Sequence, residues 1–494
     1  MTPYGATGSA MSRGPSGTTL DRDAAPSRRQ SATDPVQLAP LARWPSATGP
    51  SDVSYVVPDS YLSLPEVDAV PSLQDRNELS RLDSRSVEEL ASRLRSGEGL
   101  SQKRASLAEG QREQVPSAQP PRALSKSFTE FYTISYLILF AVLGTLARLG
   151  LQALTRYPGA PVSFSSVWPN LAGSLVIGFL TEDRMLFRYE SGSTLTSTQP
   201  VAKAKKDEET GSPDSRRVVE DLAAAKKAHT AVKKTIPLYI GLATGFCGSL
   251  TSFSSFIRDI FLALSNDLPM PDGTTTPRNG GYSFLALLAV TIGTVSLSLS
   301  GFYLGAHLAE ALEPVTPSLR YPLSSKVIDP LAAVLAWGSW IGAVILSIVP
   351  PDRYSNPGAS EFWRGRATFA LVFAPLGCLV RFYASTHLNG RHAAFPLGTY
   401  TVNVAGTAIL GLAWDLAHVP EGGVVGCQVL QGIEDGFCGC LTTVSTWIVE
   451  LCVLGRRRAY VYGCTSVISA LLLMIAIMGG LRWSQGFSPL LCVH

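Results

Sequence analysis

The residues with the clearest capacity to act on an ion are two asparagines and two arginines inside long apolar stretches. Asn170 and Asn403 each place an amide there, and Arg148 and Arg381 each place a guanidinium. A buried amide without hydrogen-bond partners is costly, and a cation at membrane depth usually faces the protein interior or an aqueous vestibule. The amides can therefore donate to an anion or link helices. The arginines can attract an anion, satisfy carbonyl groups or extend to the membrane interface, and a structural role is slightly favoured.

Two strings rich in glycine and threonine interrupt apolar segments. They read GFCGSLTSFSSF at 245–256 and GFCGCLTTVSTW at 436–447. A helix broken in the middle of a membrane frees carbonyl groups, which is tolerated only where buried protein or an ion satisfies them. Gly248 and Gly439 in these strings can equally allow close helix packing, and the residues alone favour that simpler role.

Aromatic side chains end both strings. The first carries Phe253 and Phe256 where the second carries Val444 and Trp447. The edge of an aromatic ring is positive, so a small desolvated anion can rest against it where a carboxylate would repel it. In an unrelated sequence, two aromatics at helical spacing would simply be core residues.

Hydroxyl groups accompany the strings and continue along the helices that follow. A hydroxyl can donate to an anion in transit or bond back to a carbonyl of its own helix. The candidates for a polar path are Ser252 and Thr443 in the strings, Ser296 and Ser300 in the hydroxyl-rich stretch 291–300, and Ser466.

Membrane-spanning helices must position these groups. From about residue 131 the chain is dominated by apolar runs of about 18 to 25 residues, long enough to cross ~30 Å of hydrocarbon at 1.5 Å per residue. Backbone amides in lipid must be satisfied within their own segment, so helices are expected. We predict an all-α polytopic membrane protein with about nine spans, at 131–155, 166–183, 236–264, 282–311, 328–350, 367–388, 397–418, 426–455 and 458–482.

The first quarter of the chain has a different composition. Residues 1–127 are rich in Ser, Pro, Arg, Asp and Gln, and cannot bury enough surface to offset the entropy of ordering, so we predict a disordered tail. No apolar segment follows Met1, so no cleavable signal peptide is expected. The formal net charge of +3 indicates no nucleic-acid partner.

The eight cysteines all lie in or beside apolar segments. None has metal-binding spacing with histidine, so we interpret them as small buried hydrophobic residues rather than disulfides or metal ligands. They are Cys247, Cys378, Cys427, Cys438, Cys440, Cys452, Cys464 and Cys492.

The chain contains an internal repeat. The separation of 22 positions between Arg148 and Asn170 recurs between Arg381 and Asn403, and the two strings follow in the same order. Each repeat holds four helices, with one helix at about 328–350 between them, so the second repeat enters the membrane from the opposite side and is inverted. We predict a first repeat at 128–311, a linker with the inverting helix at 312–355, and a second repeat at 356–494.

Basic residues in the predicted loops set the orientation. The loops 184–235 and 312–327 and the turn at 456–458 fall on one side in a nine-helix count, and the tail shares that side. The tail is therefore expected in the cytoplasm and the C-terminus outside the cell. The basic segment 353–366 falls on the opposite side and argues against this orientation.

These motifs resemble the CrcB or Fluc fluoride channel family, which includes bacterial channels and two-repeat eukaryotic fluoride exporters. The resemblance rests on the strings, the asparagine helices and G-x-x-x-R, and covers about 131–482. The family's bacterial protein is an antiparallel dimer, so this chain looks like a fused version that can act as a monomer. The resemblance implies a fluoride path past the asparagines and ring edges, and one structural Na⁺ held by backbone carbonyls of Gly248, Thr251, Gly439 and Thr442.

The function implied by the resemblance is a fluoride-selective channel of the plasma membrane that confers fluoride resistance. A passive path suffices for export, because a negative interior drives anions out with about 2.3 kcal/mol per charge for each 100 mV. If each pore takes one aromatic from each repeat, Phe253 pairs with Trp447 and Phe256 with Val444, and only one pore is expected to be competent.

The main alternative is a proton-coupled secondary transporter of fluoride or another small ion. No catalytic set is found in the membrane region, so we do not expect an enzyme. A proton-coupled transporter usually uses an intramembrane carboxylate. Glu434, Asp435 and Asp259 lie near helix ends, and the first two have Ala243 and Thr244 as their repeat equivalents, so they are poor candidates for a shared mechanism.

Overall fold

A computed structural model describes most of the chain after residue 125, and all described residues belong to one compact unit, Pro50–His494. The predicted tail, most of the predicted loop 184–235 and the basic segment 353–366 lie outside the described residues. The described ranges are 126–187, 233, 235–269, 278–318, 324–349, 367–392, 394–419 and 423–492. Within these ranges every regular element is helical, which confirms the predicted all-α class.

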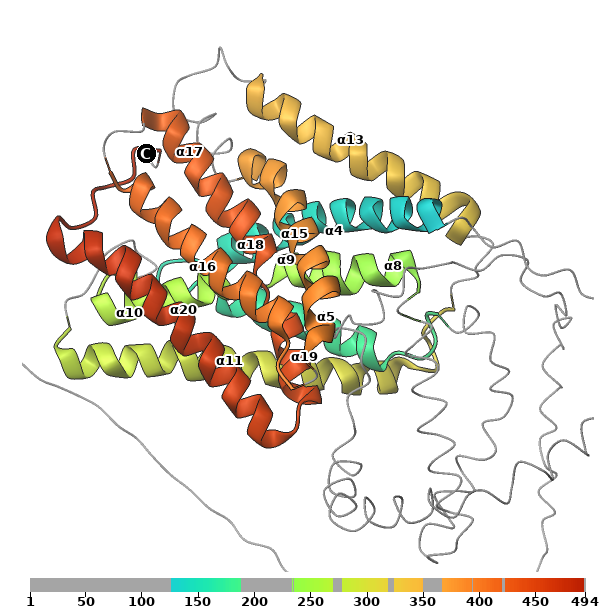
Figure 1. The fold of residues 1–494 in the computed structure, drawn as a ribbon, viewed down its shortest axis with the longest axis horizontal. Coiled ribbons are helices and arrows are strands. Elements are labelled where there is room, and N and C mark those ends of the chain that lie inside the picture. Colours follow the sequence, from blue (N-terminus) through green and yellow to red (C-terminus); the bar gives the residue numbers. More distant parts are fainter. Residues whose placement is uncertain are drawn as a thin grey trace, which may run out of the picture. The chain divides into compact units, whose positions relative to one another are not determined.

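The first repeat contains four long helical segments, of which the third is broken (Figure 1). A further segment, η6 (Ser324–Ile328) with α13 (Asp329–Ile348), follows as the linker helix and packs against the first helix of each repeat. The elements of the first repeat are α4 (Lys126–Thr155), α5 (Val167–Glu182), the broken segment α8 (Pro237–Ile240), η5 (Gly241–Cys247), α9 (Gly248–Leu250) and α10 (Phe253–Ser265), and α11 (Gly280–Leu312).

The second repeat has the same order of elements, including the break. Its elements are α15 (Phe369–Leu388), the short η8 (Asn389–Arg391), α16 (Leu397–Ala417), the broken segment α17 (Gly423–Gly432), η9 (Ile433–Cys438), α18 (Gly439–Leu441) and α19 (Ser445–Val453), and α20 (Arg456–Ser484).

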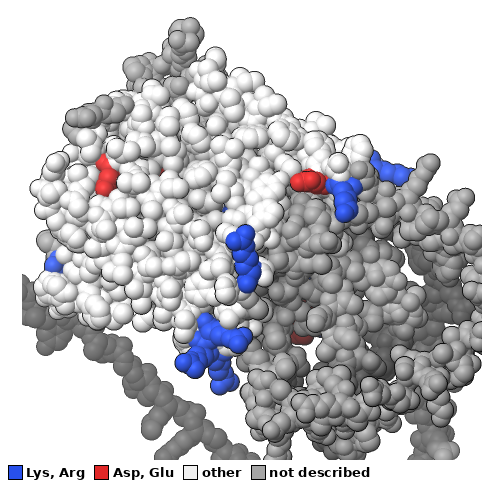
Figure 2. Space-filling model, viewed as in Figure 1, with Lys and Arg blue, Asp and Glu red and all other residues white. Residues whose placement is uncertain are grey.

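Seven of the described helical segments are long and apolar enough to cross a membrane. They coincide with seven of the nine predicted spans. The other two predicted spans are α5, which is 16 residues long, and α16; these helices carry Asn170 and Asn403. Figure 2 shows a face of the helical region with few charged side chains, as expected of a surface that contacts lipid.

Equivalent helices of the two repeats make equivalent packing contacts. Within each repeat, the first helix packs on the π-helical part of the broken segment, α4 on η5 and α15 on η9. Across the repeats, α10 packs on α16 and α20, while α19 packs on α5 and α11. Such exchange, in which each half offers the other the same surface, is the signature of a two-fold relation.

Small residues let α5 and α11 approach closely. A Cβ added at Gly178 would overlap the backbone of Phe302, and one added at Gly305 would overlap the backbone of Leu175. Helices in lipid associate through such close packing because lipid tails are as apolar as the side chains that they replace. The glycines therefore fix the distance between the helix that carries Asn170 and the hydroxyl-rich helix.

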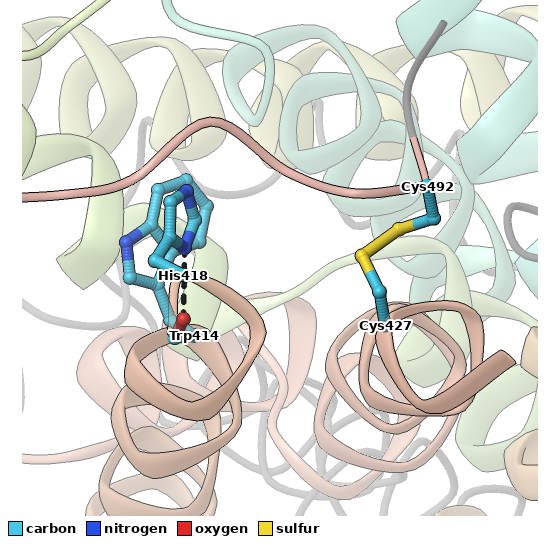
Figure 3. Close-up of a disulfide and its surroundings, with 4 residues drawn as sticks. All are labelled: Trp414, His418, Cys427 and Cys492. Carbon is cyan, nitrogen blue, oxygen red and sulfur yellow. Dashed lines mark hydrogen bonds between the residues drawn. A yellow bond between two sulfur atoms is a disulfide. The ribbon is translucent and has the colours of Figure 1, made fainter. Parts of the chain in front are cut away.

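The prediction that all eight cysteines are buried and unpaired is wrong for three of them. Cys427 of α17 and Cys492 form a disulfide with a Cα–Cα distance of 5.7 Å (Figure 3), and Cys464 is exposed. The bonded residues are 65 positions apart, and they meet because the chain folds back over α17 after α20 ends. Spacing alone carries no sign of that return. The other five cysteines are buried and unpaired, as predicted.

Candidate ion site at the paired helix breaks

Each broken segment leaves the helical conformation at a threonine. Thr251 has φ −92° and ψ 149°, and Thr442 has φ −96° and ψ 151°, so both lie in the extended region. The two breaks are adjacent, because α9 packs on α18. The paired interruption predicted from the two strings is therefore present, and residues 247–257 and 438–450 around it are all buried.

The asparagines hold the breaks open. The side-chain Oδ1 of Asn170 accepts from the backbone N–H of Ser252 at 2.9 Å, and Oδ1 of Asn403 accepts from that of Thr443 at 2.9 Å. Each Nδ2 donates to the carbonyl of the same residue, at 3.5 Å and 3.2 Å. Both amides are fully buried, and both bind the backbone of the break. They therefore link helices, and neither amide is left as a free donor.

These contacts leave backbone carbonyls without their helical donors. In a continuous helix the N–H of residue i+4 donates to the carbonyl of residue i. The N–H of Ser252 would serve Gly248, but it donates to Asn170 instead. By the same exchange, the N–H of Thr443 is diverted from Gly439.

The carbonyls of the two threonines lose their donors in the same way. The N–H of Ser255 donates to Oγ of Ser252 at 3.3 Å instead of reaching Thr251. The N–H of Thr446 donates to Oγ1 of Thr443 at 3.5 Å instead of reaching Thr442. The four carbonyls released are those of the residues predicted to hold Na⁺, and oxygen is the ligand that hard cations take. In the described residues no cluster of three His, Cys, Asp or Glu side chains offers another metal site.

The hydroxyl of each threonine accepts a hydrogen bond from the backbone of the other repeat. Oγ1 of Thr442 accepts from the N–H of Ser254 at 3.0 Å, and Oγ1 of Thr251 accepts from the N–H of Ser445 at 3.1 Å. Each hydroxyl thus satisfies a free N–H at the start of the other repeat's helix, as a helix cap does. The two breaks therefore cap each other.

The arginines also act across the repeats. Nη2 of Arg381 donates to the carbonyl of Thr244 at 2.8 Å, and Nη2 of Arg148 donates to that of Asp435. Both side chains are 1% exposed, and neither forms an ion pair with a carboxylate within the described part of the chain. A Cβ at Gly248 would overlap the guanidinium of Arg381, so the glycine provides room for the cation. Both arginines therefore bind backbone carbonyl groups, which is the structural role considered from the sequence.

The aromatic rings meet beside the breaks. The ring centroids of Phe253 and Trp447 are 5.5 Å apart with an interplanar angle of 67°, and those of Phe253 and Phe256 are 5.8 Å apart at 79°. The expected pairing of Phe253 with Trp447 across the repeats is thus present. Val444 is buried at the position equivalent to Phe253 and offers no ring.

The serines predicted to form a hydroxyl path on α11 are on the wrong face of that helix. Ser296 and Ser300 lie on the exposed face of the helix, whereas Thr294 and Ser298 are buried, and neither of these two buried oxygens has a hydrogen-bond partner. The exposed serines face outward because they follow the buried positions by two residues, about 200° around a helix. The buried residues of α11 at 290, 294, 298 and 302 correspond to those of α20 at 462, 466, 470 and 474.

The two repeats differ in the hydroxyls that remain free. Ser466, the equivalent of Thr294, donates to the carbonyl of Tyr462 at 2.8 Å. Thr407, the equivalent of Ser174 on α5, donates to the carbonyl of Asn403 at 2.7 Å, whereas the buried oxygen of Ser174 has no partner. Free hydroxyls therefore collect on α5 and α11, in the first repeat.

Comparison with known proteins places the chain among relatives. The family model described as CrcB-like protein, Camphor Resistance (CrcB), matches residues 135–306 and 368–481. The chain belongs to the CrcB family. The two matched segments coincide with the two repeats, so this CrcB-family chain contains the family's unit twice.

Curated relatives of this CrcB-family chain are named for fluoride. Fluoride export protein 1 of Neurospora crassa is 54% identical over 484 residues, which covers 91% of this chain and 88% of the relative. The Candida albicans protein of the same name is 31% identical and covers 74% and 84%. Fluoride-specific ion channel FluC 1 of Bacillus cereus is 31% identical over 116 residues, 22% of this chain and 80% of that relative. No solved structure matches.

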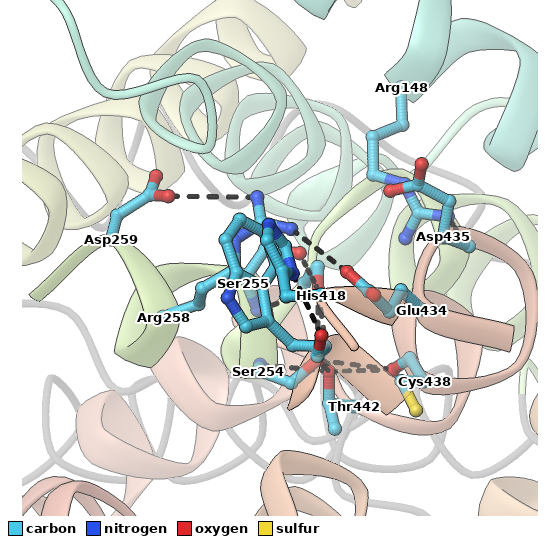
Figure 4. A network of polar contacts seen from close by, with 12 residues as sticks. Arg148, Ser254, Ser255, Arg258, Asp259, His418, Glu434, Asp435, Cys438 and Thr442 are labelled. Carbon is cyan, nitrogen blue, oxygen red and sulfur yellow. Dashed lines mark hydrogen bonds and ion pairs between the residues drawn. The ribbon is translucent and has the colours of Figure 1, made fainter. Parts of the chain in front are cut away.

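One charged cluster of this CrcB-family chain is built around an arginine that the other repeat lacks (Figure 4). Arg258 of α10 lies 3.6 Å from Asp259 and 3.7 Å from Glu434 of η9, and its guanidinium lies 5.4 Å from the centre of the Trp414 ring. The position equivalent to Arg258 is Val449. Arg258 was not singled out from the sequence, although an arginine two residues after Phe256 in an apolar segment is the kind of intramembrane charge that signals a role.

The buried carboxylate of Glu450 was also not singled out from the sequence. Glu450 is 2% exposed and accepts hydrogen bonds from the hydroxyls of Thr399 and Tyr462, each at 2.5 Å. Its repeat equivalent, Asp259, accepts instead from the N–H of Ser166 at 3.1 Å. The carboxylate at this position is therefore held at the start of the asparagine helix in both repeats, by different donors.

Proposed function

We propose that this chain is a fluoride-selective channel that lets fluoride leave the cytoplasm down its electrochemical gradient. The observation that carries the proposal is the pair of adjacent helix breaks, flanked by a ring pair and by buried hydrogen-bond donors, in a chain of the CrcB family. Relatives that span most of this chain bear the names of fluoride exporters, and the bacterial relative bears the name of a fluoride-specific channel. The function requires no covalent step, so we propose that the chain is not an enzyme.

The path proposed for fluoride runs through one competent pore. Its support is the unequal set of donors: Thr294 and Ser298 offer free hydroxyls, whereas Ser466 is bonded within its own helix. The ring pair of Phe253 and Trp447 lies beside the breaks, and α19, which carries Trp447, packs on α5 and α11. A pore built around Phe256 would face Val444, which has no ring edge to offer a desolvated anion.

A structural Na⁺ is part of the proposal. The carbonyl oxygens of Gly248, Thr251, Gly439 and Thr442 fit a hard cation, because side chains have diverted the backbone donors of all four. A bound cation would hold the two repeats together at their breaks. We expect the midpoint of thermal unfolding in detergent to fall when Na⁺ is replaced by N-methylglucamine. An unchanged midpoint would argue against the ion.

The proposed setting is the plasma membrane, with the tail in the cytoplasm and the C-terminus outside. If α5 and α16 cross the membrane like the seven apolar segments, the linker helix makes an odd total, and the repeats are inverted. Two repeats that cap each other's breaks form a complete unit, so we propose that the chain functions as a monomer.

The deciding experiment is fluoride efflux from liposomes that contain the purified chain. Vesicles loaded with KF and treated with valinomycin should release fluoride without any proton gradient, and chloride-loaded vesicles should not release chloride. Phe253→Ile should lose most of the flux, whereas Phe284→Ile, at an exposed position on α11, should not. Flux that needs a proton gradient would identify a coupled transporter instead, and absence of flux under both conditions would overturn the proposal.

A further inference from the structure

The indole N–H of Trp447 is a buried donor without an acceptor. The side chain is 2% exposed, and its Nε1 has no hydrogen-bond partner. Most buried side-chain donors in proteins are paired, and each exception needs an explanation. The indoles of Trp337 and Trp340 on the linker helix follow the rule, since they donate to Oγ of Ser135 and to the carbonyl of Val372.

The groups around this indole do not supply an acceptor. The carboxylate closest along α19 is that of Glu450, three residues further on, and two hydroxyls at 2.5 Å already occupy it. The edge of the indole that carries Nε1 and Cζ2 faces α20 at a glycine: a Cβ added to Gly463 would lie 3.7 Å from Cζ2. No side chain of that residue covers the edge.

The surroundings favour a small anion. An indole nitrogen donates and does not accept, so its partner must be electron-rich. Phe253 lies in a tilted, edge-type contact with the same ring, and ring edges are positive. Arg148 and Arg381 add two buried positive charges to the adjacent breaks, with no ion-paired carboxylate in the described part of the chain.

We propose that Nε1 of Trp447 donates a hydrogen bond to fluoride in transit, so that this residue binds the ion through an N–H where a phenylalanine would offer only a ring edge. The proposal rests on the proposed function. Trp414 also has an unpaired indole nitrogen, but its ring contacts the cation of Arg258 and stacks on His418 at the end of α16, outside the ring pair.

The first test replaces the indole by a ring without the donor. Trp447→Phe keeps an aromatic contact with Phe253 and should lower fluoride flux in liposomes about tenfold at low fluoride, a change equal to 1.4 kcal/mol. Trp483→Phe, at a position that is 62% exposed on α20, is the matched control and should leave the flux unchanged. Full flux in Trp447→Phe, with the wild type conducting, would overturn the assignment while leaving the channel function intact.

The second test observes the donor itself. In full-length protein labelled with ¹⁵N-indole tryptophan, the Trp447 N–H resonance is the one that disappears in Trp447→Phe. We expect it to shift on addition of KF and not on addition of KCl. A resonance that stays in place at fluoride concentrations that support flux would overturn the proposal, even if the substitution lowers the flux through a change in packing.

Discussion

At the scale of single residues, Asn170 and Asn403 act on the backbone. Each amide takes the N–H that would otherwise close the helix and returns a bond to the carbonyl of the same residue. The geometry is the same in both repeats, although only one pore is proposed to conduct. The amides therefore stabilise the breaks themselves and, through the breaks, the proposed Na⁺ site.

A substitution at either asparagine should destabilise the protein by a similar amount. Asn170→Leu and Asn403→Leu each leave a buried backbone N–H unpaired, which costs about 1–3 kcal/mol. The measurement is the midpoint of thermal unfolding in detergent for both variants. If only Asn170→Leu lost flux, and neither variant lost stability, the asparagine would be acting as an ion ligand instead.

The arginines illustrate how far residue types alone predict a role. A cation in an apolar helix is expected to face the protein interior or an aqueous vestibule, and Arg148 and Arg381 are both buried in the protein. Their partners, the carbonyls of Asp435 and Thr244, were not predictable, since they belong to the other repeat and become available only through the irregular geometry of η9 and η5.

At the scale of elements, the existence of the helices and of both breaks followed from the sequence, but the rotation of α11 did not. Apolar residues surround that helix on all sides, and serines or threonines recur along it from 291 to 300, so no periodic pattern distinguishes its buried face. Packing against α5 decides it, through the close approaches at Gly178 and Gly305.

The rotation of α11 gives a test with matched pairs. Thr294→Val and Ser298→Ala remove the two free buried hydroxyls and should each lower fluoride flux severalfold, since an anion in transit loses a donor. Ser296→Ala and Ser300→Ala, on the exposed face, should leave the flux unchanged. If the Ser296 and Ser300 variants lost flux in the same liposome assay and the Thr294 and Ser298 variants did not, the path predicted from the sequence would be the correct one.

At the scale of the whole molecule, the disulfide ties the end of the chain to the second repeat. It closes a loop between residues 65 positions apart, and chain entropy alone predicts about 4 kcal/mol of stabilisation for a loop of that size. Disulfides persist in oxidising compartments. The bond between Cys427 and Cys492 thus supports the proposal that the C-terminus lies outside the cell.

The disulfide can be tested in the native membrane. Without reductant, Cys427 and Cys492 should resist a maleimide reagent after denaturation, and both should react after reduction. The double variant Cys427→Ser, Cys492→Ser should unfold at a lower temperature than the wild type. Modification of both cysteines without reductant would contradict the bond and remove this support for the orientation.

The exchange of hydroxyl caps between the breaks has a consequence for biosynthesis. Ser254 and its partner Thr442 are 188 residues apart, so at 5–20 residues per second the ribosome needs about 10–40 s to supply the second after the first. During that interval the first broken helix is already made, with polar backbone groups that lipid cannot satisfy. The polar groups of the nascent first repeat must therefore be satisfied by the insertion machinery or by retained water until the second repeat has been synthesised.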